Sequence, residues 1–282
     1  MHPTLFHVFG IQITTYGLMV TTAFMTLWFS SVYRGVRLGY ASDFIQNLLT
    51  VIVISAMLSA RLLYVMINLD YFFAHPAEIL LSRDGYVFLG GFLGGVVGAA
   101  WYVRRHQKSI LGVADLFAPY LALAQAIGRV GCFLFGCCYG KVCALPWAVR
   151  FPQDSPAYLD HLQNGLIGMD AVTSLPVHPA QLYGSAFNLV HFFVLLAIRR
   201  FQRFRGQVAM SYLVIYSFAR FGLEMVRGDY RGAFGGISTS QWLSLVTGLA
   251  GAYGFWILLK RNEHPEKPLP TPKSESLSLA QK

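Results

Sequence analysis

Charged residues are scarce in this sequence. They make up 12% of its 282 residues, whereas soluble domains carry about 25%. Acidic residues are the scarcer kind, with 13 Asp and Glu against 22 Lys and Arg. This shortage excludes an ordinary soluble domain. Hydrophobic residues instead fill 55% of the chain, in runs of about 18 residues or more, the length that crosses a bilayer as a helix. The composition is that of a multi-pass membrane protein.

The sequence also lacks the marks of a cleavable signal peptide and of internal repeats. Its first residues, "MHPTLFHVFG", contain no basic region and no small-residue cleavage motif, so we expect the first span to act as the targeting signal. We expect residues 1–262 to form one membrane domain. Residues 263–282 are rich in Pro, Ser and Lys without an apolar period, which predicts a disordered cytoplasmic tail.

Seven apolar segments predict an all-α integral membrane protein with seven transmembrane helices: 14–33, 47–68, 86–103, 111–134, 179–198, 207–226 and 237–259. Basic residues cluster after the first, third, fifth and seventh segments, which are alternate loops. The positive-inside rule makes these loops cytoplasmic, so the N-terminus is predicted to be periplasmic and the C-terminus cytoplasmic. The net charge of +9 therefore follows the topology and does not indicate a nucleic-acid partner.

Three further segments have sequence patterns that predict local structure. Residues 69–85 are amphipathic and are expected to lie along the membrane interface. Residues 136–177 form the longest polar stretch, whose Pro, Asp and aromatic content predicts a folded periplasmic cap over an outward-facing site. In "LGGFLGGVVGAA", residues 89–100, glycines recur at four-residue spacing. This stripe indicates either close helix packing or a groove wide enough for a lipid chain.

Three arginines, Arg61, Arg129 and Arg220, fall within predicted spans. Each costs about 2.5–3.5 kcal/mol at the bilayer centre and needs an acceptor. Asp115 and Glu224 are the only acidic residues within the predicted spans. Glu224 follows Arg220 by four residues, a spacing at which its carboxylate can neutralise the guanidinium of Arg220. A rise of about 1.5 Å per residue places the arginines toward the outer leaflet, where a phospholipid phosphate would accept bidentate hydrogen bonds. We therefore predict that Arg129 and Arg220 bind a lipid phosphate, with carbonyl oxygens and water as the alternative acceptors. For Arg61, phosphate binding and these alternative acceptors are equally favoured.

The four cysteines, Cys132, Cys137, Cys138 and Cys143, are spaced C-x4-C-C-x4-C. On the oxidising side of the membrane, a disulfide joining Cys137 or Cys138 to Cys132 or Cys143 is the favoured interpretation. Three alternatives stay open: inert packing, a nucleophilic thiol, and a metal site, against which the absence of C-x2-C spacing argues. We expect no metal and no cofactor.

Several ordered motifs point to a known family. They are "TTYGLMV" around Tyr16, "SARLLYV" around Arg61, "VADLFAPYLALAQAIGRVG" through Arg129, "HPAQLY" from His178, and "YSFARFGLEMVRGDYRG" followed by "ISTSQWLSL". From about residue 2 to 255 the chain resembles the prolipoprotein diacylglyceryl transferase family of bacterial inner membranes. The resemblance implies a seven-span enzyme that moves the diacylglyceryl group of phosphatidylglycerol onto the lipobox cysteine of a prolipoprotein and releases glycerol phosphate. Its partners would be phosphatidylglycerol, the prolipoprotein signal peptide and membrane lipids.

The resemblance also implies roles for individual residues. Arg129 and Arg220 match essential or lipid-contacting arginines of the family, and Tyr216 would orient the head group. His178 is the imidazole whose depth in the membrane best suits a base that takes the proton of the acceptor thiol. The alternative is that His178 is a structural histidine at the start of a helix. Further substrate contacts are expected from Tyr16, Arg61, Gln181, Tyr183 and Glu224.

The chain departs from the family pattern at several polar positions. In the motif G-R-x-G-N-F-x-N-G-E-x-x-G, Cys132 and Phe135 replace the two Asn residues, and Cys137 replaces Glu. Leu89 stands where the family has a histidine proposed to take the acceptor's thiol proton, and Gly184 stands where it has Glu. These departures leave two alternatives open: a transferase with the same lipid donor and another acceptor, or a non-catalytic lipid-binding protein.

Overall fold

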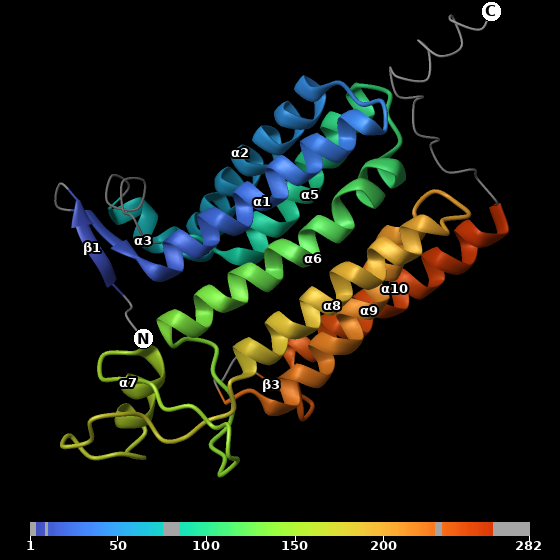
Figure 1. Ribbon diagram of the computed structural model, residues 1–282. Helices are drawn as coiled ribbons and strands as arrows, with labels where there is room; N and C mark the ends of the chain where they lie inside the picture. The colour runs from blue at the N-terminus through green and yellow to red at the C-terminus, as the bar shows by residue number, and fades with distance from the viewer. Residues whose placement is uncertain (1–3, 9–10, 76–84, 229–232, 262–282) are drawn as a thin grey trace, which may run out of the picture. The chain divides into compact units, whose positions relative to one another are not determined.

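The computed structural model describes residues 4–8, 11–75, 85–228 and 233–261 (Figure 1). The chain divides into two compact units. Within the described residues, the first unit contains residues 4–30 and 114–261, and the second contains residues 31–113. The predicted tail, 263–282, lies outside the described residues.

Seven of the described helices have 18 residues or more: α1 (Thr15–Arg37), α2 (Ser42–Ile67), α5 (Phe88–Arg105), α6 (Ile110–Phe135), α8 (Ala180–Arg200), α9 (Gln207–Val226) and α10 (Thr239–Arg261). Each coincides with one predicted span. Four of them, α2, α6, α8 and α10, are long and apolar enough to cross a membrane. Large apolar side chains such as Leu58 and Leu249 are exposed on these helices, as lipid contact requires. The fold is that of an all-α integral membrane protein.

Four helices run past their predicted ends because they include the basic residues that follow the apolar run. The last turns of α1, α5, α8 and α10 carry pairs of cations: Arg34 and Arg37, Arg104 and Arg105, Arg199 and Arg200, Lys260 and Arg261. A positive charge at a helix C-terminus interacts favourably with the helix dipole. These basic residues are unsuited to the bilayer core, but at the C-terminal ends of the four helices they stabilise the helix.

In the first unit, α8, α9 and α10 lie side by side (Figure 1). Helix α6 is joined to α8 through the Ser185 hydroxyl, which donates to the Ala126 carbonyl at 2.9 Å. The first half of α1 lies against α6, since a Cβ on Gly131 would come within 2.8 Å of the Met19 side chain. A buried cluster holds α6, α8 and α9 together: Ala118, Ala122, Leu195, Val208 and Tyr212.

The start of α9 is capped by Asp115 of α6. Its carboxylate accepts from the backbone N–H groups of Gly206 at 2.6 Å and Ala209 at 2.8 Å. Gly206 itself has a φ of +88°, and no side chain of its own caps the helix. Asp115, one of the two acidic residues within the predicted spans, therefore has a structural role.

The segment 136–177 is folded. Helix α7 (Pro156–Gln163) begins with Ser155 as N-cap, whose hydroxyl accepts from the Tyr158 N–H at 3.2 Å, and with Pro156 in its first turn. Single β-bridges join Val142 and Val149 to Val177. The segment has a small core of its own, formed by Tyr139, Phe151, Ala157 and Val177.

The second unit is built on the pair α2 and α5. Gly90 and Gly94 of α5 face α2 so closely that added Cβ atoms would lie 2.6 Å from the Ser59 carbonyl oxygen and 2.7 Å from the Ser55 carbonyl oxygen. The glycine stripe therefore packs helices. Helix α3 (Leu69–Ala74) follows α2; the rest of the predicted interfacial segment, 76–84, lies outside the described residues.

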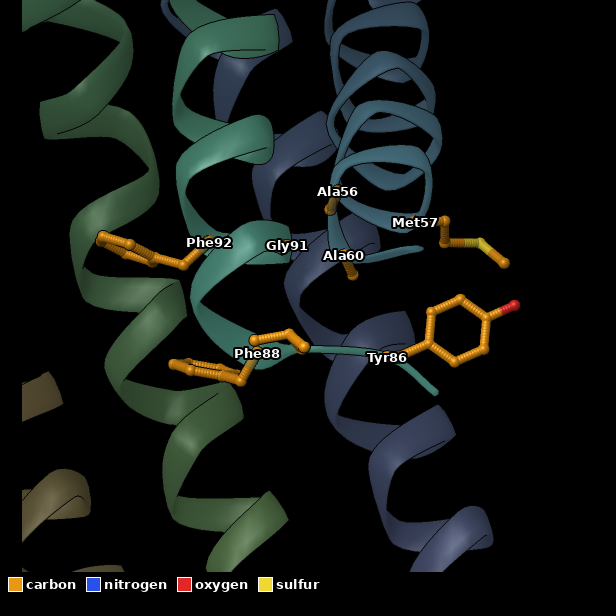
Figure 2. A pocket seen from close by; sticks show the side chains of 8 residues that line it. Ala56, Met57, Ala60, Tyr86, Phe88, Gly91 and Phe92 are labelled. Atoms are coloured by element: carbon orange, nitrogen blue, oxygen red, sulfur yellow. The ribbon is translucent and has the colours of Figure 1, made fainter. Parts of the chain in front are cut away.

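An apolar pocket of about 530 Å³ borders the same stripe. Ala56, Ala60 and Gly91 line it, with Phe88 and Phe92 on one side and Tyr86 and Met57 on the other (Figure 2). The stripe thus packs against α2 and also borders an apolar pocket.

Two short hairpins were not predicted from the sequence. Strands β1 (Thr4–Val8) and β2 (Ile11–Thr14) pair antiparallel, as do β3 (Ala233–Phe234) and β4 (Ile237–Ser238). Gly235 and Gly236 join β3 to β4 with φ values of +61° and +77°. Positive φ at both positions is the requirement of a type I′ turn, which glycine meets without steric cost.

Candidate functional site

Three guanidinium groups and one carboxylate gather in the first unit. Arg220 and Glu224, one turn apart on α9, form an ion pair of 2.6 Å, with side chains 12% and 7% exposed. The Arg227 Nε lies 3.9 Å from the same Glu224 oxygen. The positive charges of Arg129 and Arg227 are close enough to act on Arg220. Among the described residues, the one carboxylate of this cluster therefore pairs with two of its three cations, Arg220 and Arg227.

Arg220 has further support from the protein. Its Nη2 donates to the Ser240 hydroxyl of α10 at 2.9 Å. The spacing of Arg220 and Glu224 predicted their pairing, and the structure contains it. Arg227, at the C-terminal cap of α9, was missed because it falls after the predicted span. The signal that would have found it is its position three residues after Glu224, on the same helix face.

Arg129, on α6, is partly buried, and no carboxylate within the described part of the chain pairs with it. It lies against Gly184 of α8, where an added Cβ would be 3.6 Å from the Arg129 Cδ and Nε atoms. A side chain at position 184 would therefore contact this guanidinium. Glycine leaves that side of Arg129 without a neighbouring acid.

Other predicted residues surround the same region. Tyr216 lies one turn before Arg220, its ring stacked on that of Tyr212 at 5.6 Å. Tyr16, in the first turn of α1, is 41% exposed and interacts electrostatically with Arg129. The fully buried Gln181 donates through Nε2 to the Cys137 carbonyl at 2.8 Å, and its Oε1 has no partner within the described residues.

His178 belongs to a short polar chain next to the start of α8. The Trp147 Nε1 donates to the Tyr183 hydroxyl at 2.7 Å, and that hydroxyl lies 3.4 Å from the His178 Nδ1. The His178 backbone is held by Gly140 and Lys141 through bonds of 3.0 Å each. These contacts give His178 a structural role at the helix start, and the residue is partly exposed.

Arg61 belongs to the second unit, and its described contacts are all within that unit. Its Nη1 donates to the Gly85 carbonyl at 3.1 Å, and its guanidinium lies 5.2 Å from the centre of the Tyr86 ring. A carbonyl acceptor is thus present at Arg61, as the alternative interpretation allowed.

The cysteines show an arrangement that their spacing did not predict. The sulfur atoms of Cys132, Cys137 and Cys138 lie within 4.8 Å of one another, whereas Cys143 is outside this group. All four are free thiols, and the predicted disulfide stays a prediction. Hydrogen bonds from Cys132, Cys137 and Arg227 hold the pKa of the Cys138 thiol well below its usual range.

Two buried polar residues of α8 were also missed. The Asn188 Oδ1 and both ring nitrogens of His191 are buried, and within the described residues none has a hydrogen-bond partner. The Asn188 Nδ2 donates to the Gly184 carbonyl at 2.8 Å, and His191 stacks on Tyr212 at 5.1 Å. Helical spacing from Gln181 places both on the buried face of α8, a signal that the sequence contained.

The chain is similar to known proteins over most of its length. The sequence profile of the prolipoprotein diacylglyceryl transferase family matches residues 3–257. The chain is 34% identical to the phosphatidylglycerol–prolipoprotein diacylglyceryl transferase of Clostridium tetani, over 90% of this chain and 97% of that protein. It is 32% identical to the second such enzyme of Clostridium perfringens, over 95% and 100% of the two chains. With the enzyme of Ralstonia pickettii, the identity is 35% over 88% and 90%. The chain belongs to the prolipoprotein diacylglyceryl transferase family.

Proposed function

We propose that this chain is a phosphatidylglycerol–prolipoprotein diacylglyceryl transferase. The lipobox thiol sulfur forms a bond to the terminal glycerol carbon of the diacylglyceryl group. The bond between that carbon and the phosphate oxygen breaks, and glycerol phosphate leaves with the electron pair. The thiol gives its proton to a base. Family membership and the names of the relatives support this activity.

The observation that carries the proposal is the excess of guanidinium groups over carboxylates around Arg129. Glu224 is within ion-pair distance of both Arg220 and Arg227, which leaves Arg129 as the cation best placed to hold a phosphate. A guanidinium binds a phosphate through two parallel, charge-assisted hydrogen bonds. The same contacts stabilise the charge that develops on the leaving glycerol phosphate.

The neighbouring residues have supporting roles in this proposal. Tyr216 orients the lipid head group from the turn before Arg220, and Tyr16 contacts it from α1. Gln181 and Tyr183 shape the site through their contacts with Cys137 and Trp147. Arg61 stays a predicted substrate contact.

His178 is the proposed proton acceptor. It can act in this way only in the tautomer in which Nδ1–H donates to the Tyr183 hydroxyl, because Nε2 then carries a free lone pair. Leu89, the position of the family histidine, is a half-exposed side chain of α5 and offers no base.

We further propose that all seven long helices span the bacterial inner membrane, with the N-terminus periplasmic and the C-terminus cytoplasmic. Residues 1–262 would form the membrane domain, 136–177 the periplasmic cap that receives the acceptor, and 263–282 a disordered tail. The cationic last turns of α1, α5, α8 and α10 support this orientation, because they would all lie on the cytoplasmic side.

The function is tested with purified protein in nanodiscs that contain phosphatidylglycerol, to which a lipobox peptide is added. We expect release of glycerol phosphate and a diacylglyceryl mass increase on the peptide. Arg129→Ala and Arg129→Lys should both lower turnover by about 10²-fold or more, since an ammonium cannot make the bidentate contact. The exposed Arg104 at the end of α5 provides a matched control, and Arg104→Ala should keep wild-type turnover.

The products also separate the alternatives. Glycerol phosphate without a modified peptide would indicate another acceptor. Binding of phosphatidylglycerol without release of glycerol phosphate would indicate a lipid-binding protein. Wild-type turnover in folded Arg129→Ala would remove Arg129 from the site.

A further inference from the structure

Three thiols of the first unit converge on one point. The sulfur atoms of Cys132, Cys137 and Cys138 all lie within 4.8 Å of one another, and each residue is partly buried. A single disulfide uses two sulfurs and would leave the third unpaired. Three convergent sulfurs match instead the donor set of a metal ion.

The local backbone is shaped to bring these thiols together. Cys132 lies in the last turn of α6, and its carbonyl accepts from both the Gly136 N–H at 3.0 Å and the Cys137 N–H at 3.1 Å. Gly136 has a φ of +85°, which ends the helix and turns the chain back. Cys138 has a φ of +61°, a conformation that costs a residue with a Cβ about 1–2 kcal/mol. Such a conformation persists where surrounding contacts fix it.

Those surrounding contacts come from two other segments. Gln181 of α8 donates to the Cys137 carbonyl at 2.8 Å. Beyond the thiols, the Gly228 N–H donates to the Tyr139 carbonyl at 3.2 Å, and Gly140 forms a β-bridge with Arg227. The turn is therefore held from both sides, and the thiols are positioned before any ligand arrives.

We propose that Cys132, Cys137 and Cys138 bind one thiophilic metal ion through their three sulfur atoms. Thiolates select soft ions, of which Cu⁺ and Zn²⁺ are the common cases. A zinc–sulfur bond of about 2.3 Å separates tetrahedral sulfurs by about 3.8 Å, so small side-chain rotations from the present spacing suffice. No fourth His, Cys, Asp or Glu joins the group within the described residues. This favours three-coordinate Cu⁺, or Zn²⁺ with one open position.

The surrounding charge suits such a site. Three thiolates with Cu⁺ have a net charge of −2. The guanidinium of Arg227 interacts with Cys138, and that of Arg129 with Cys132. The two cations can balance the charge of the complex. The ion would also tie the end of α6, at Cys132, to the turn that follows it, at Cys137 and Cys138.

The test uses full-length protein purified in detergent without oxygen and with its thiols reduced. Cu⁺ and Zn²⁺ are titrated separately in competition with a chromophoric chelator. We expect one equivalent of at least one of the two ions to bind. Cys132→Ser, Cys137→Ser and Cys138→Ser should each weaken binding by more than the about 10–100-fold that loss of an outer-shell partner costs. Cys143→Ser should bind like the wild type, because its sulfur lies outside the group.

Folding is checked separately, since a serine variant that unfolds would also lose the ion. Each variant is compared with the wild type by thermal unfolding and by lipid turnover. The metal content of the protein as isolated gives a measurement on the unaltered chain.

Three results would overturn the proposal: no binding of either ion by folded, reduced protein; binding that depends equally on Cys143; or a disulfide between two of the three thiols in protein taken directly from the membrane. None of these results depends on transferase activity, so the metal site and the proposed function can fail independently.

Discussion

At the scale of single residues, Glu224 is the charge on which the arginine cluster depends. Glu224→Gln would leave the guanidinium groups of Arg220 and Arg227 without their shared carboxylate. Removal of one partner of a buried ion pair typically costs about 3–5 kcal/mol, because an uncompensated charge stays buried. We therefore expect this variant to lose about 3 kcal/mol of stability, measured by unfolding of the protein in detergent.

A matched control removes a carboxylate that has no such role. Asp154 is exposed, and its φ of +64° is a conformation that Asn tolerates. Asp154→Asn should change stability by less than about 0.5 kcal/mol. Equal losses in the two variants would mean that Glu224 does not hold the cluster together.

His161 should make the folded segment 136–177 sensitive to acid. Its side chain is 3% exposed, and its Nδ1 accepts from the Leu175 N–H at 3.2 Å. Burial lowers the pKa of His161 below its usual value of 6.5, although the Asp160 carboxylate partly opposes this effect. Below about pH 6.5 the unfolded chain therefore binds a proton that the folded chain refuses, and stability falls as the pH decreases.

The measurement is hydrogen-exchange protection of residues 174–177 across this pH range. Protection should fall between about pH 7 and pH 5 in the wild type and stay flatter in His161→Asn, which cannot titrate. Identical pH profiles would show that another group governs the acid response.

The site could be predicted only where its residues are related by local spacing. The pairing of Arg220 with Glu224 follows from one helical turn, and the structure contains it. The contact of Arg129 with Gly184 joins two helices and depends on their packing, which no local pattern encodes. The same is true of the three sulfurs, because Cys138 reaches the group through a positive φ that composition does not reveal.

At the scale of elements, the pairing of α2 with α5 depends on the face that each glycine presents. A Cβ on Gly94 would overlap the Ser59 hydroxyl and lie 2.7 Å from the Ser55 carbonyl oxygen. A Cβ on Gly95 would meet nothing closer than 3.6 Å. Gly94→Ala should therefore destabilise the pair by about 1–3 kcal/mol through overpacking, whereas Gly95→Ala should be neutral or stabilising by up to about 1 kcal/mol.

The two alanine variants are controls for each other, since they share a helix and gain the same intrinsic helix propensity. Thermal unfolding in one detergent compares them directly. If both shift the midpoint by the same amount and in the same direction, the stripe does not pack against α2.

The long helices were predictable because membrane crossing demands a long apolar run, and such runs are visible in composition alone. The ends of the helices were less predictable. Helices α1 and α8 continue beyond their apolar runs to Arg37 and Arg200, because a positive charge is stabilised at a helix C-terminus. The cap of α9 was not predictable, since Asp115 is contributed by another helix, α6.

At the scale of the whole molecule, the proposed topology depends on the alternation of basic helix ends. If seven helices span the membrane, the loop around Gln107 is cytoplasmic and the segment around Asn164 is periplasmic. Alkaline phosphatase, which folds only outside the cytoplasm, should therefore be active when fused after Asn164 and inactive when fused after Gln107. Green fluorescent protein should give the reverse result, and should also fluoresce when fused after Arg261.

This experiment examines the weakest point of the seven-span prediction. Helices α1, α5 and α9 are long, yet they are outside the four that are apolar enough to cross a membrane by length and composition. If α5 lay along the interface while α2 and α6 still crossed the membrane, Gln107 would be periplasmic and Asn164 cytoplasmic, because α6 separates the two residues. Phosphatase activity at Gln107 without activity at Asn164 would therefore remove α5 from the spans, and the arginine cluster would no longer be predicted to face the periplasm.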